Sequence, residues 1–351
     1  MFGGIKAGRL ISEAMVRKGH RVNIIYCDIP KAWPRIWQPS QIMRRCWREL
    51  KMSGKEKHHL EKSKANLIPV PVRPITSPYV PDADVTIGTW WEVIEWISKF
   101  PDSKGIKVDF VQGHDATNSG EKERIVATYK LPMLKIAVSP WLKRVLRDKY
   151  SVNNVIVVPN GIDRKQFDSQ PRDKNINPTV GFVFSNHPIK DMHTALKALM
   201  IVQKNLPSLK VIAFGSYWPD FDKHIFRNFQ YHCRPPQHKI AEIYRKTDCW
   251  FLSSISEGLP MPLLEAIACR CPIVSTDYGG ANDVIDNGVN GYIVPVREPD
   301  MLANAISKVL SLSENDWRRM SEVSYQISKK FDWDKSAAIL EKALMGAIES
   351  R

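Results

Sequence analysis

Two glutamates, Glu257 and Glu265, stand eight residues apart in the stretch SSISEGLPMPLLEAIACRCPIVSTDYGG, residues 253–280. Pro262 between them suits the first turn of a helix, where its missing N–H has no intrahelical partner. The stretch therefore predicts a loop that carries Glu257 and a helix from about residue 262 with Glu265 in its first turn. A helix start favours an anion, so the arrangement suits a ligand with hydroxyls at both ends and phosphates in the middle. Taken singly, Glu257 is also explained as a turn residue and Glu265 as a dipole-friendly residue of a first helical turn.

The elements that must position these carboxylates alternate between short β-branched runs and segments of helical periodicity. The expected strands are 21–27, 67–72, 84–89, 108–112, 135–139 and 155–159, then 179–184, 209–215, 249–254, 272–276 and 291–295. The expected helices are 5–18, 91–99 and 140–149, then 191–204, 238–246, 262–270, 299–311 and 336–349. Alternating β and α segments predict parallel, doubly wound sheets. Two such blocks predict an α/β protein of two Rossmann-like domains that face each other across a cleft, with ligands at the carboxyl ends of the strands.

The composition indicates an ordinary soluble globular chain, with 43% hydrophobic and 25% charged residues among 351. No apolar run approaches the roughly 18 residues of a membrane span. The first ten residues lack the apolar core of a signal peptide, so a cytoplasmic protein is expected. None of the six cysteines forms a C-x-x-C pair, which favours reduced, buried thiols. Two D-x-D patterns, 82–84 and 332–334, are not expected to bind metal, because Asp334 is explained as the N-cap of the last helix.

The net charge of +14 is concentrated in residues 31–64, which carry ten Lys and Arg against three Glu, a surplus of seven. Trp33, Trp37 and Trp47 are interleaved with them. A segment that combines basic residues with tryptophans suits an anionic membrane surface, because indole rings favour the headgroup region and basic side chains pair with lipid phosphates. The alternative is a solvated insertion whose tryptophans pack locally. No nucleic-acid-binding module is visible, so no nucleic-acid partner is expected.

The double-glutamate block continues as A-x-A-x-x-x-P-I-V-S-T-D-x-G-G and so resembles the retaining glycosyltransferases of family 4, which have the GT-B fold. VVPNGIDRKQF (157–167) resembles the interdomain motif of that family, and RKGHRVNIIY (17–26) resembles the segment after its first helix. DVTIGTWWEVIEWI, FVQGHDA and YKLPMLKIAVSPWLKRVL resemble a subgroup that builds bacterial surface polysaccharides. The resemblance implies retaining, metal-independent transfer from a nucleotide-sugar donor to a glycan or lipid-linked acceptor, without a cofactor. With the basic segment, it also implies a peripheral position on the inner face of the cell membrane.

The resemblance also implies roles for single residues. Glu265 matches the glutamate that binds the ribose hydroxyls, and Glu257 the one that contacts the donor sugar. Lys190 matches the lysine that neutralises the diphosphate, and His114 is implied as a further catalytic residue. The remaining implied positions are the donor-binding Gly258, Leu259, Met261, Gly3, Gly4 and Ser185, and the acceptor-side Gln112 and Asp115.

Two departures from the family pattern stand out. The family has an arginine a few residues before the lysine, whereas VGFVFSNHPIKD has none, which leaves Ser185 or His187 as partial substitutes. Gly3–Gly4 resembles the glycine turn that follows the first β-strand, but no strand precedes it here. We therefore expect the first strand of the N-terminal domain to be missing, with a gap in the middle of that sheet.

The expected domains follow the motifs. An acceptor-side domain over 1–160 contains the basic insertion 31–64, and a linker covers 161–178. A donor domain covers 179–333, and a helix over 334–351 crosses back to the first domain. Two alternatives stay open: another GT-B enzyme such as a sugar-nucleotide epimerase, and a catalytically weakened GT-B paralogue that acts as a binding partner.

Overall fold

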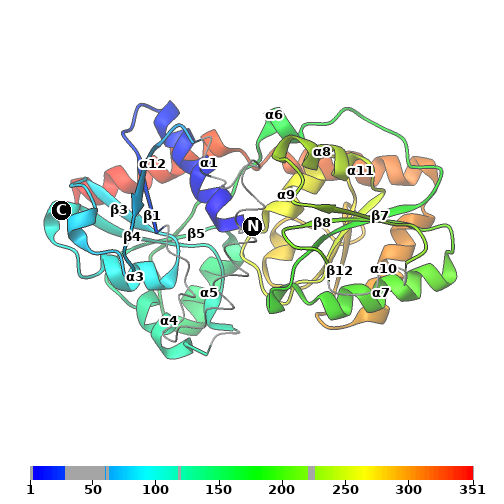
Figure 1. Ribbon diagram of the computed structural model, residues 1–351, viewed down its shortest axis with the longest axis horizontal. Coiled ribbons are helices and arrows are strands. Elements are labelled where there is room, and N and C mark those ends of the chain that lie inside the picture. Colours follow the sequence, from blue (N-terminus) through cyan, green and yellow to red (C-terminus); the bar gives the residue numbers. More distant parts are fainter. Residues whose placement is uncertain (1–2, 28–59, 61–62, 118–119, 220–225, 351) are drawn as a thin grey trace, which may run out of the picture.

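The computed structural model describes residues 3–27, 60, 63–117, 120–219 and 226–350. These residues form two α/β halves side by side, each built on parallel strands (Figure 1). The expected fold class, an α/β protein of two Rossmann-like domains with parallel sheets, is confirmed. The basic segment 31–64 lies outside the described residues except for positions 60, 63 and 64. None of the helices in the described ranges combines the length and hydropathy needed to span a bilayer.

The C-terminal half contains a six-stranded parallel sheet in the order β12-β11-β10-β7-β8-β9. Its strands are β7 (Thr179–Phe184), β8 (Lys210–Gly215), β9 (Phe229–Cys233), β10 (Cys249–Leu252), β11 (Ile273–Thr276) and β12 (Gly291–Val294). Its helices are α7 (Met192–Asn205), α8 (Gln237–Arg245), α9 (Met261–Ala268), α10 (Pro299–Ser311) and α11 (Glu314–Ser328). The strand order reverses between β7 and β10, which is where such sheets bind ligands.

The N-terminal half contains two separate parallel ladders. One joins β3 (Val85–Gly88), β4 (Ile106–Val111), β5 (Leu134–Ala137) and β6 (Val155–Val157), and the other joins β1 (Asn23–Cys27) to β2 (Asn66–Val70). The helices of this half are α1 (Gly3–Arg17), α3 (Trp91–Ile97), α4 (Lys122–Tyr129) and α5 (Pro140–Tyr150). Within the described residues no backbone pairing joins β1 to β3. The missing first strand stays a prediction.

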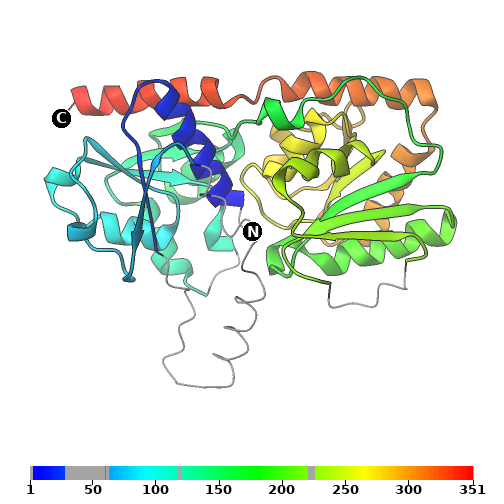
Figure 2. The same cartoon turned by 45° about the horizontal axis from the view of Figure 1, so that its top comes forward.

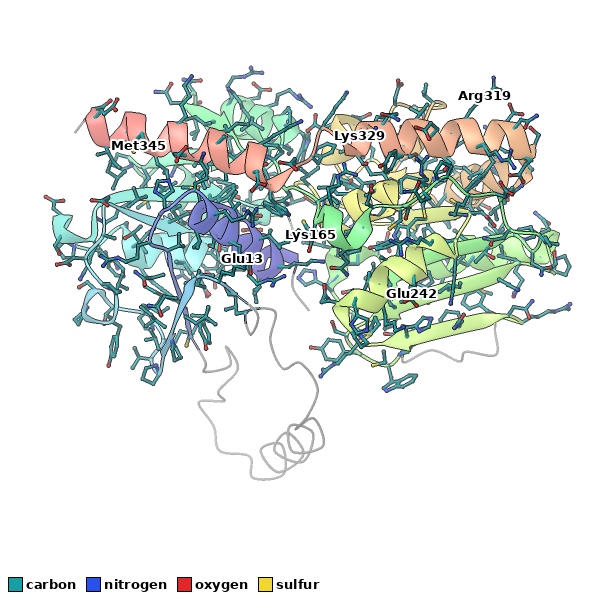
Figure 3. All side chains as sticks on the ribbon, turned by 90° about the horizontal axis from the view of Figure 1, so that it is seen from above. Glu13, Lys165, Glu242, Arg319, Lys329 and Met345 are labelled. Atoms are coloured by element: carbon teal, nitrogen blue, oxygen red, sulfur yellow. The ribbon has the colours of Figure 1, made fainter. Side chains whose placement is uncertain are left out.

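Two helices connect the halves. α6 (Arg164–Phe167) follows β6, and α12 (Trp333–Glu349) runs end to end with α11 along one side of the molecule (Figures 2 and 3). α12 packs against α1, and Lys18 Nζ of the segment after α1 lies 2.9 Å from Glu341 Oε2. A Cβ on Gly161 would lie 2.5 Å from the backbone nitrogen of Trp333, so only glycine permits this close crossing.

The start of α12 corrects one expectation. Asp332, not Asp334, is the N-cap: its carboxylate accepts hydrogen bonds from the backbone N–H groups of Asp334 and Lys335. Asp334 lies in the first turn and accepts a hydrogen bond from Arg17 Nε at 3.1 Å. The helix begins earlier than expected because Trp333 is buried in the core, which places the cap two residues upstream of the expected one.

The core is continuous across both halves. One cluster of buried residues extends from Ala7 of α1 through Ile136 of β5 to Leu263 of α9 and Leu340 of α12. A second cluster lies between the C-terminal sheet and α7 and α10. The five described cysteines are free thiols, and three of them, Cys249, Cys269 and Cys271, are buried, as the sequence suggested.

Candidate active site

A cleft of about 1250 Å³ lies between the two halves. Segments that follow the carboxyl ends of strands supply much of its lining: Gln112 follows β4, Ser185 follows β7, and Glu257 follows β10. Every site residue expected from the sequence lines this cleft except Gly3: Gly4, Gln112, His114, Asp115, Ser185, Lys190, Glu257, Gly258, Leu259, Met261 and Glu265. The placement agrees with the rule that open parallel sheets bind ligands at this edge.

Glu257 and Lys190 form an ion pair inside the C-terminal half, Nζ against Oε1. The loop that carries Glu257 is fixed to the segment that carries Lys190, because Ile255 N–H donates to the Ile189 carbonyl at 2.8 Å and Ser253 Oγ to the Lys190 carbonyl at 2.7 Å. Both side chains keep partial exposure, 26% for Lys190 and 17% for Glu257. The pair is therefore pre-positioned and reachable from the cleft.

A third group, Ser254, fixes the orientation of the Glu257 carboxylate. Its hydroxyl donates to Oε1 at 2.8 Å, the same oxygen that Lys190 contacts. The backbone N–H of Glu257 donates to the Tyr278 carbonyl at 3.3 Å, which ties the loop to the segment after β11. Since Oε1 carries these contacts, Oε2 is the oxygen that can face a ligand.

Glu265 is almost fully buried, with 4% of its surface exposed. Its Oε1 lies 2.6 Å from Lys6 Nζ of α1, and its Oε2 accepts a hydrogen bond of 3.0 Å from the Tyr244 hydroxyl of α8. α9 begins at Met261, so Glu265 lies one residue beyond the first helical turn, not in it as expected. The difference arises because the helix starts one residue before Pro262, which occupies its second position.

The loop between the two glutamates touches the opposite half of the molecule. A Cβ on Gly258 would clash with the backbone carbonyl of Gln112, so glycine is required at this approach. Asn160 Nδ2 donates to the Leu259 carbonyl at 2.9 Å. Leu259 and Met261 are buried at 4% and 5% exposure, so a ligand can meet mainly the backbone here.

His114 is buried, and hydroxyl groups contact both of its ring nitrogens. Nε2 lies 2.7 Å from the Tyr150 hydroxyl, and Nδ1 lies 2.5 Å from Thr117 Oγ1. Burial, together with the nearby Lys149 and Lys122, lowers the pKa of His114 from 6.5 to about 4. The ring is therefore neutral near pH 7, and its hydrogen bonds favour a positioning role.

Asp115 lies beside His114 at the start of a short 3-10 helix and also lines the cleft. Burial, and then the nearby Asp109 carboxylate, raises the pKa of Asp115 from 3.8 to about 7. A carboxyl group with a pKa near neutrality can accept or donate a proton at physiological pH.

The glycine pair has a different conformation from the one expected. Gly3 and Gly4 are the first residues of α1, so they belong to a helical turn and not to a separate glycine turn before it. Gly4 is exposed to the cleft, with no heavy atom within 4 Å of a Cβ built on it.

Ser185 lies in the loop after β7. Its Oγ accepts a hydrogen bond of 3.2 Å from the His187 N–H.

Sequence reasoning missed three groups of the site: Lys6 and Arg234, which line the cleft, and Tyr244, which is buried behind Glu265. Lys6 carries a sequence signal, since it lies two residues after the glycine pair at the start of a helix. Arg234 follows the end of β9, a strand the sequence did not reveal, and its Nε donates to the Ser216 carbonyl at 2.7 Å. Tyr244 is fully buried, and burial, followed by the Glu265 carboxylate, raises its pKa well above 10. Its hydroxyl therefore remains a proton donor. No group of three or more metal-ligating side chains occurs in the described ranges.

Known proteins resemble this chain in both sequence and fold. Residues 162–326 match the family model of the group 1 glycosyl transferases. An uncharacterised glycosyltransferase of Methanocaldococcus jannaschii is 28% identical over 207 residues, 57% of this chain and 56% of that protein. A D-inositol 3-phosphate glycosyltransferase of Corynebacterium jeikeium is 34% identical over 110 residues, 31% of this chain and 26% of that protein. The chain thus spans little more than half the length of the first relative and about a quarter of the second.

A solved structure extends the likeness to the whole fold. The Anabaena protein Alr3699/HepE, crystallised with UDP and glucose, superposes with a TM-score of 0.74 at 17% identity. The match covers 97% of this chain and 96% of that protein. Together with the parallel sheets on either side of a cleft, it shows that this chain has the GT-B fold.

Proposed function

We propose that this protein is a retaining glycosyltransferase that transfers a sugar from a nucleotide-sugar donor. The observation that carries the proposal is the Lys190–Glu257 ion pair, which lies with Glu265 in one cleft at the carboxyl ends of the strands. In this proposal Glu265 binds the ribose, Glu257 binds the donor sugar through its free oxygen, and Lys190 faces the diphosphate. The donor that we favour is a UDP-sugar, because the structural relative from Anabaena holds UDP.

The chemistry that these residues can provide is electrostatic. As the bond between the sugar and the diphosphate breaks, negative charge grows on the leaving phosphate, and a preorganised cation such as Lys190 stabilises that charge. The closed cleft makes the interaction stronger than it would be in water. The leaving phosphate accepts the proton of the attacking hydroxyl on the same face of the sugar, so the anomeric configuration is retained. This route uses no protein nucleophile and no metal.

The acceptor that we propose is a glycan or a lipid-linked glycan of polysaccharide or cell-envelope synthesis, handled at the inner face of the membrane. The support is the basic, tryptophan-containing segment 31–64, which suits an anionic lipid surface. Replacing Arg44, Arg45, Arg48 and Lys51 with Gln should reduce co-sedimentation with anionic vesicles at low salt. Unchanged co-sedimentation would favour the solvated insertion instead.

Donor use can be tested without knowing the acceptor. Thermal-shift titration with UDP-, GDP-, ADP- and dTDP-sugars identifies the nucleotide, since a ligand that binds only the folded state raises its melting temperature. The sugar that stabilises the protein is then followed by proton NMR during hydrolysis or transfer. Retention predicts that the first product has the anomeric configuration of the donor. Inverted product would refute the retaining mechanism, and no binding of any nucleotide-sugar would refute the proposed function.

A further inference from the structure

Lys6 is a buried cation that crosses the cleft. It lies in the first turns of α1 in the N-terminal half, and only 6% of its surface is exposed. Its Nζ lies 2.6 Å from Glu265 Oε1 of α9, a residue 259 positions away in the other half. The same Nζ lies 4.8 Å from the centre of the Phe167 ring. A carboxylate and an ammonium this deeply buried depend on each other, because either charge alone is costly to bury.

Both oxygens of Glu265 are occupied in this arrangement. Oε1 faces Lys6, and Oε2 accepts the hydrogen bond from Tyr244. Each oxygen can accept a second hydrogen bond, but only 5% of the Glu265 side chain is exposed, so a ligand hydroxyl reaches the carboxylate only if one of these partners moves away. Tyr244 is fully buried, with its ring packed against Phe214 and Trp250, so it stays in place. Lys6 has a flexible side chain near the N-terminus of α1, where it lines the cleft. Lys6 is therefore the partner that moves.

We propose that Lys6 is an internal competitor for the donor site: it occupies Glu265 in the free protein, and the ribose reaches that carboxylate only after Lys6 has left. The inference rests on the proposed function for the identity of the ligand, but not for the Lys6–Glu265 contact itself. Once displaced, the ammonium remains in the cleft, where the diphosphate of the proposed donor offers it a new counter-charge. When the donor binds, the Lys6 ammonium therefore exchanges the Glu265 carboxylate for the diphosphate as its counter-charge.

The position of α1 supports this role. The far end of the helix is attached to α12, where Arg17 donates to Asp334 at 3.1 Å and Lys18 pairs with Glu341. The near end carries Lys6 into the cleft. Because α1 is fixed at one end, Lys6 returns to the same place whenever the ligand leaves. The fold therefore holds Lys6 beside Glu265 whenever the site is free of ligand.

The first experiment tests the contact without any ligand. Amine-selective labelling followed by mass spectrometry should modify Lys6 more slowly than Lys18, whose side chain is 31% exposed on the same segment. In a Glu265→Gln variant Lys6 loses its counter-charge, so its labelling rate should rise while that of Lys18 stays the same. Equal rates for Lys6 and Lys18 in the unsubstituted protein, or no change in the variant, would overturn the proposal.

The second experiment tests competition with neutral uridine, which lacks phosphates and so does not gain from the charge of Lys6. A Lys6→Met variant should bind uridine more tightly, by about tenfold if the Lys6–Glu265 pair is formed nine-tenths of the time. Isothermal titration gives the dissociation constants. Equal or weaker binding by the variant would show that Lys6 assists the ligand, which contradicts competition. If this variant does not fold, Lys6→Gln serves in its place.

Two matched variants separate competition from general loosening of the site. Arg17→Met removes a cation of the same helix that pairs with Asp334 and does not line the cleft, and it should leave uridine binding unchanged. Tyr244→Phe removes the other hydrogen bond to Glu265 without changing charge. Because Tyr244 is fully buried and its ring stays in place, this change opens no path from the cleft to the carboxylate and should not tighten binding. If neither the unsubstituted protein nor Lys6→Met binds uridine or UDP, the proposed donor is wrong. The labelling result then still decides whether Lys6 occupies Glu265.

Discussion

Glu257 and Glu265 each face a lysine, but the two lysines reach them in different ways. Lys190 and Glu257 belong to neighbouring segments of one half, so the local fold alone brings them together. Lys6 reaches Glu265 only when the two halves are assembled. This difference explains why the sequence motifs marked Lys190 and Glu257 as separate site residues and missed Lys6: no local pattern marks a partner 259 residues away.

At the scale of single residues, we predict different effects for the two carboxylates. Glu257→Ala should mainly lower kcat, because its free oxygen is proposed to act on the sugar. Loss of Glu265 should mainly weaken nucleotide binding, because this residue is proposed to hold the ribose. Each lost charged hydrogen bond is worth roughly 1.5–3 kcal/mol, or about ten- to hundredfold. Steady-state kinetics and UDP titration measure the two effects.

The control for Glu265 must account for Lys6. A single substitution leaves the Lys6 ammonium buried without its partner, which disturbs the site by itself. In the double variant Lys6→Met/Glu265→Gln neither charge remains, so any loss of UDP affinity reports the missing ligand contact. Equal, small effects of Glu257→Ala and of this double variant on kcat/KM would contradict the assignment.

A second prediction at this scale concerns acid stability. Burial depresses the pKa of His114 to about 4, so the folded protein keeps the ring neutral while the unfolded chain protonates it below about pH 6.5. His114 therefore makes the free energy of unfolding fall as the pH drops from about 6.5 towards 4. A His114→Gln variant should be less stable at pH 7, because the contacts with Tyr150 and Thr117 are weakened, but its deficit should narrow towards pH 4.5. Urea unfolding at pH 7, 5.5 and 4.5 measures this, and a deficit independent of pH would contradict it.

At the scale of secondary structure, the strands with β-branched sequences were predictable and several other elements were not. β7 and α10 lie where the sequence placed them, because a buried strand and an amphipathic helix each leave a clear pattern. α11 was missed because three serines occupy its buried face: Ser321 donates to the Arg270 carbonyl and Ser324 to the Asn290 carbonyl. Polar residues that satisfy carbonyl groups conceal the helical period. β9 was missed because it pairs only with β8 and is half-buried.

Two glycines provide a prediction about these elements. Gly279 has φ +104°, and a Cβ there would overlap the Trp141 ring of α5. Gly279→Ala should therefore destabilise the protein by roughly 1–3 kcal/mol and separate α5 from the loop after β11. Gly346, in the exposed part of α12, has no heavy atom within 4 Å of its Cβ position. Gly346→Ala should instead stabilise the fold by about 0.5–1 kcal/mol. Urea unfolding compares them, and equal effects of the two substitutions would be inconsistent with the close approach at Gly279.

At the scale of the whole molecule, polar contacts join the halves near the site, in addition to the apolar core that the halves share. Asn160 bonds to the Leu259 carbonyl, Lys6 pairs with Glu265, and Asp283 binds the start of α5. Each of these contacts joins a polar group of one half to a polar group of the other. Polar contacts between halves can be exchanged for ligand or water more readily than apolar packing, although the buried Lys6–Glu265 pair needs a replacement counter-charge. Such contacts suit a cleft that opens and closes around the proposed donor.

Asp283 provides the test of this view. Its Oδ2 accepts a hydrogen bond of 2.8 Å from the backbone N–H of Trp141, in the first turn of α5, and its Oδ1 lies 3.3 Å from Arg144 Nη2. A carboxylate at a helix N-terminus is favoured by the free N–H groups and by the helix dipole. Asp283→Asn keeps the shape of the side chain but removes its charge. We therefore expect the halves to separate more often and the radius of gyration from small-angle X-ray scattering to increase in the ligand-free protein.

The control is Asp286→Asn, which removes an exposed carboxylate three residues further along the chain and should leave the radius of gyration unchanged. Saturating donor should return Asp283→Asn to the compact form, because the proposed donor would contact both halves of the cleft and so favour the closed state. Identical radii for the two variants would show that Asp283 does not control closure, and the apolar core shared by the halves would then be the main restraint on their separation.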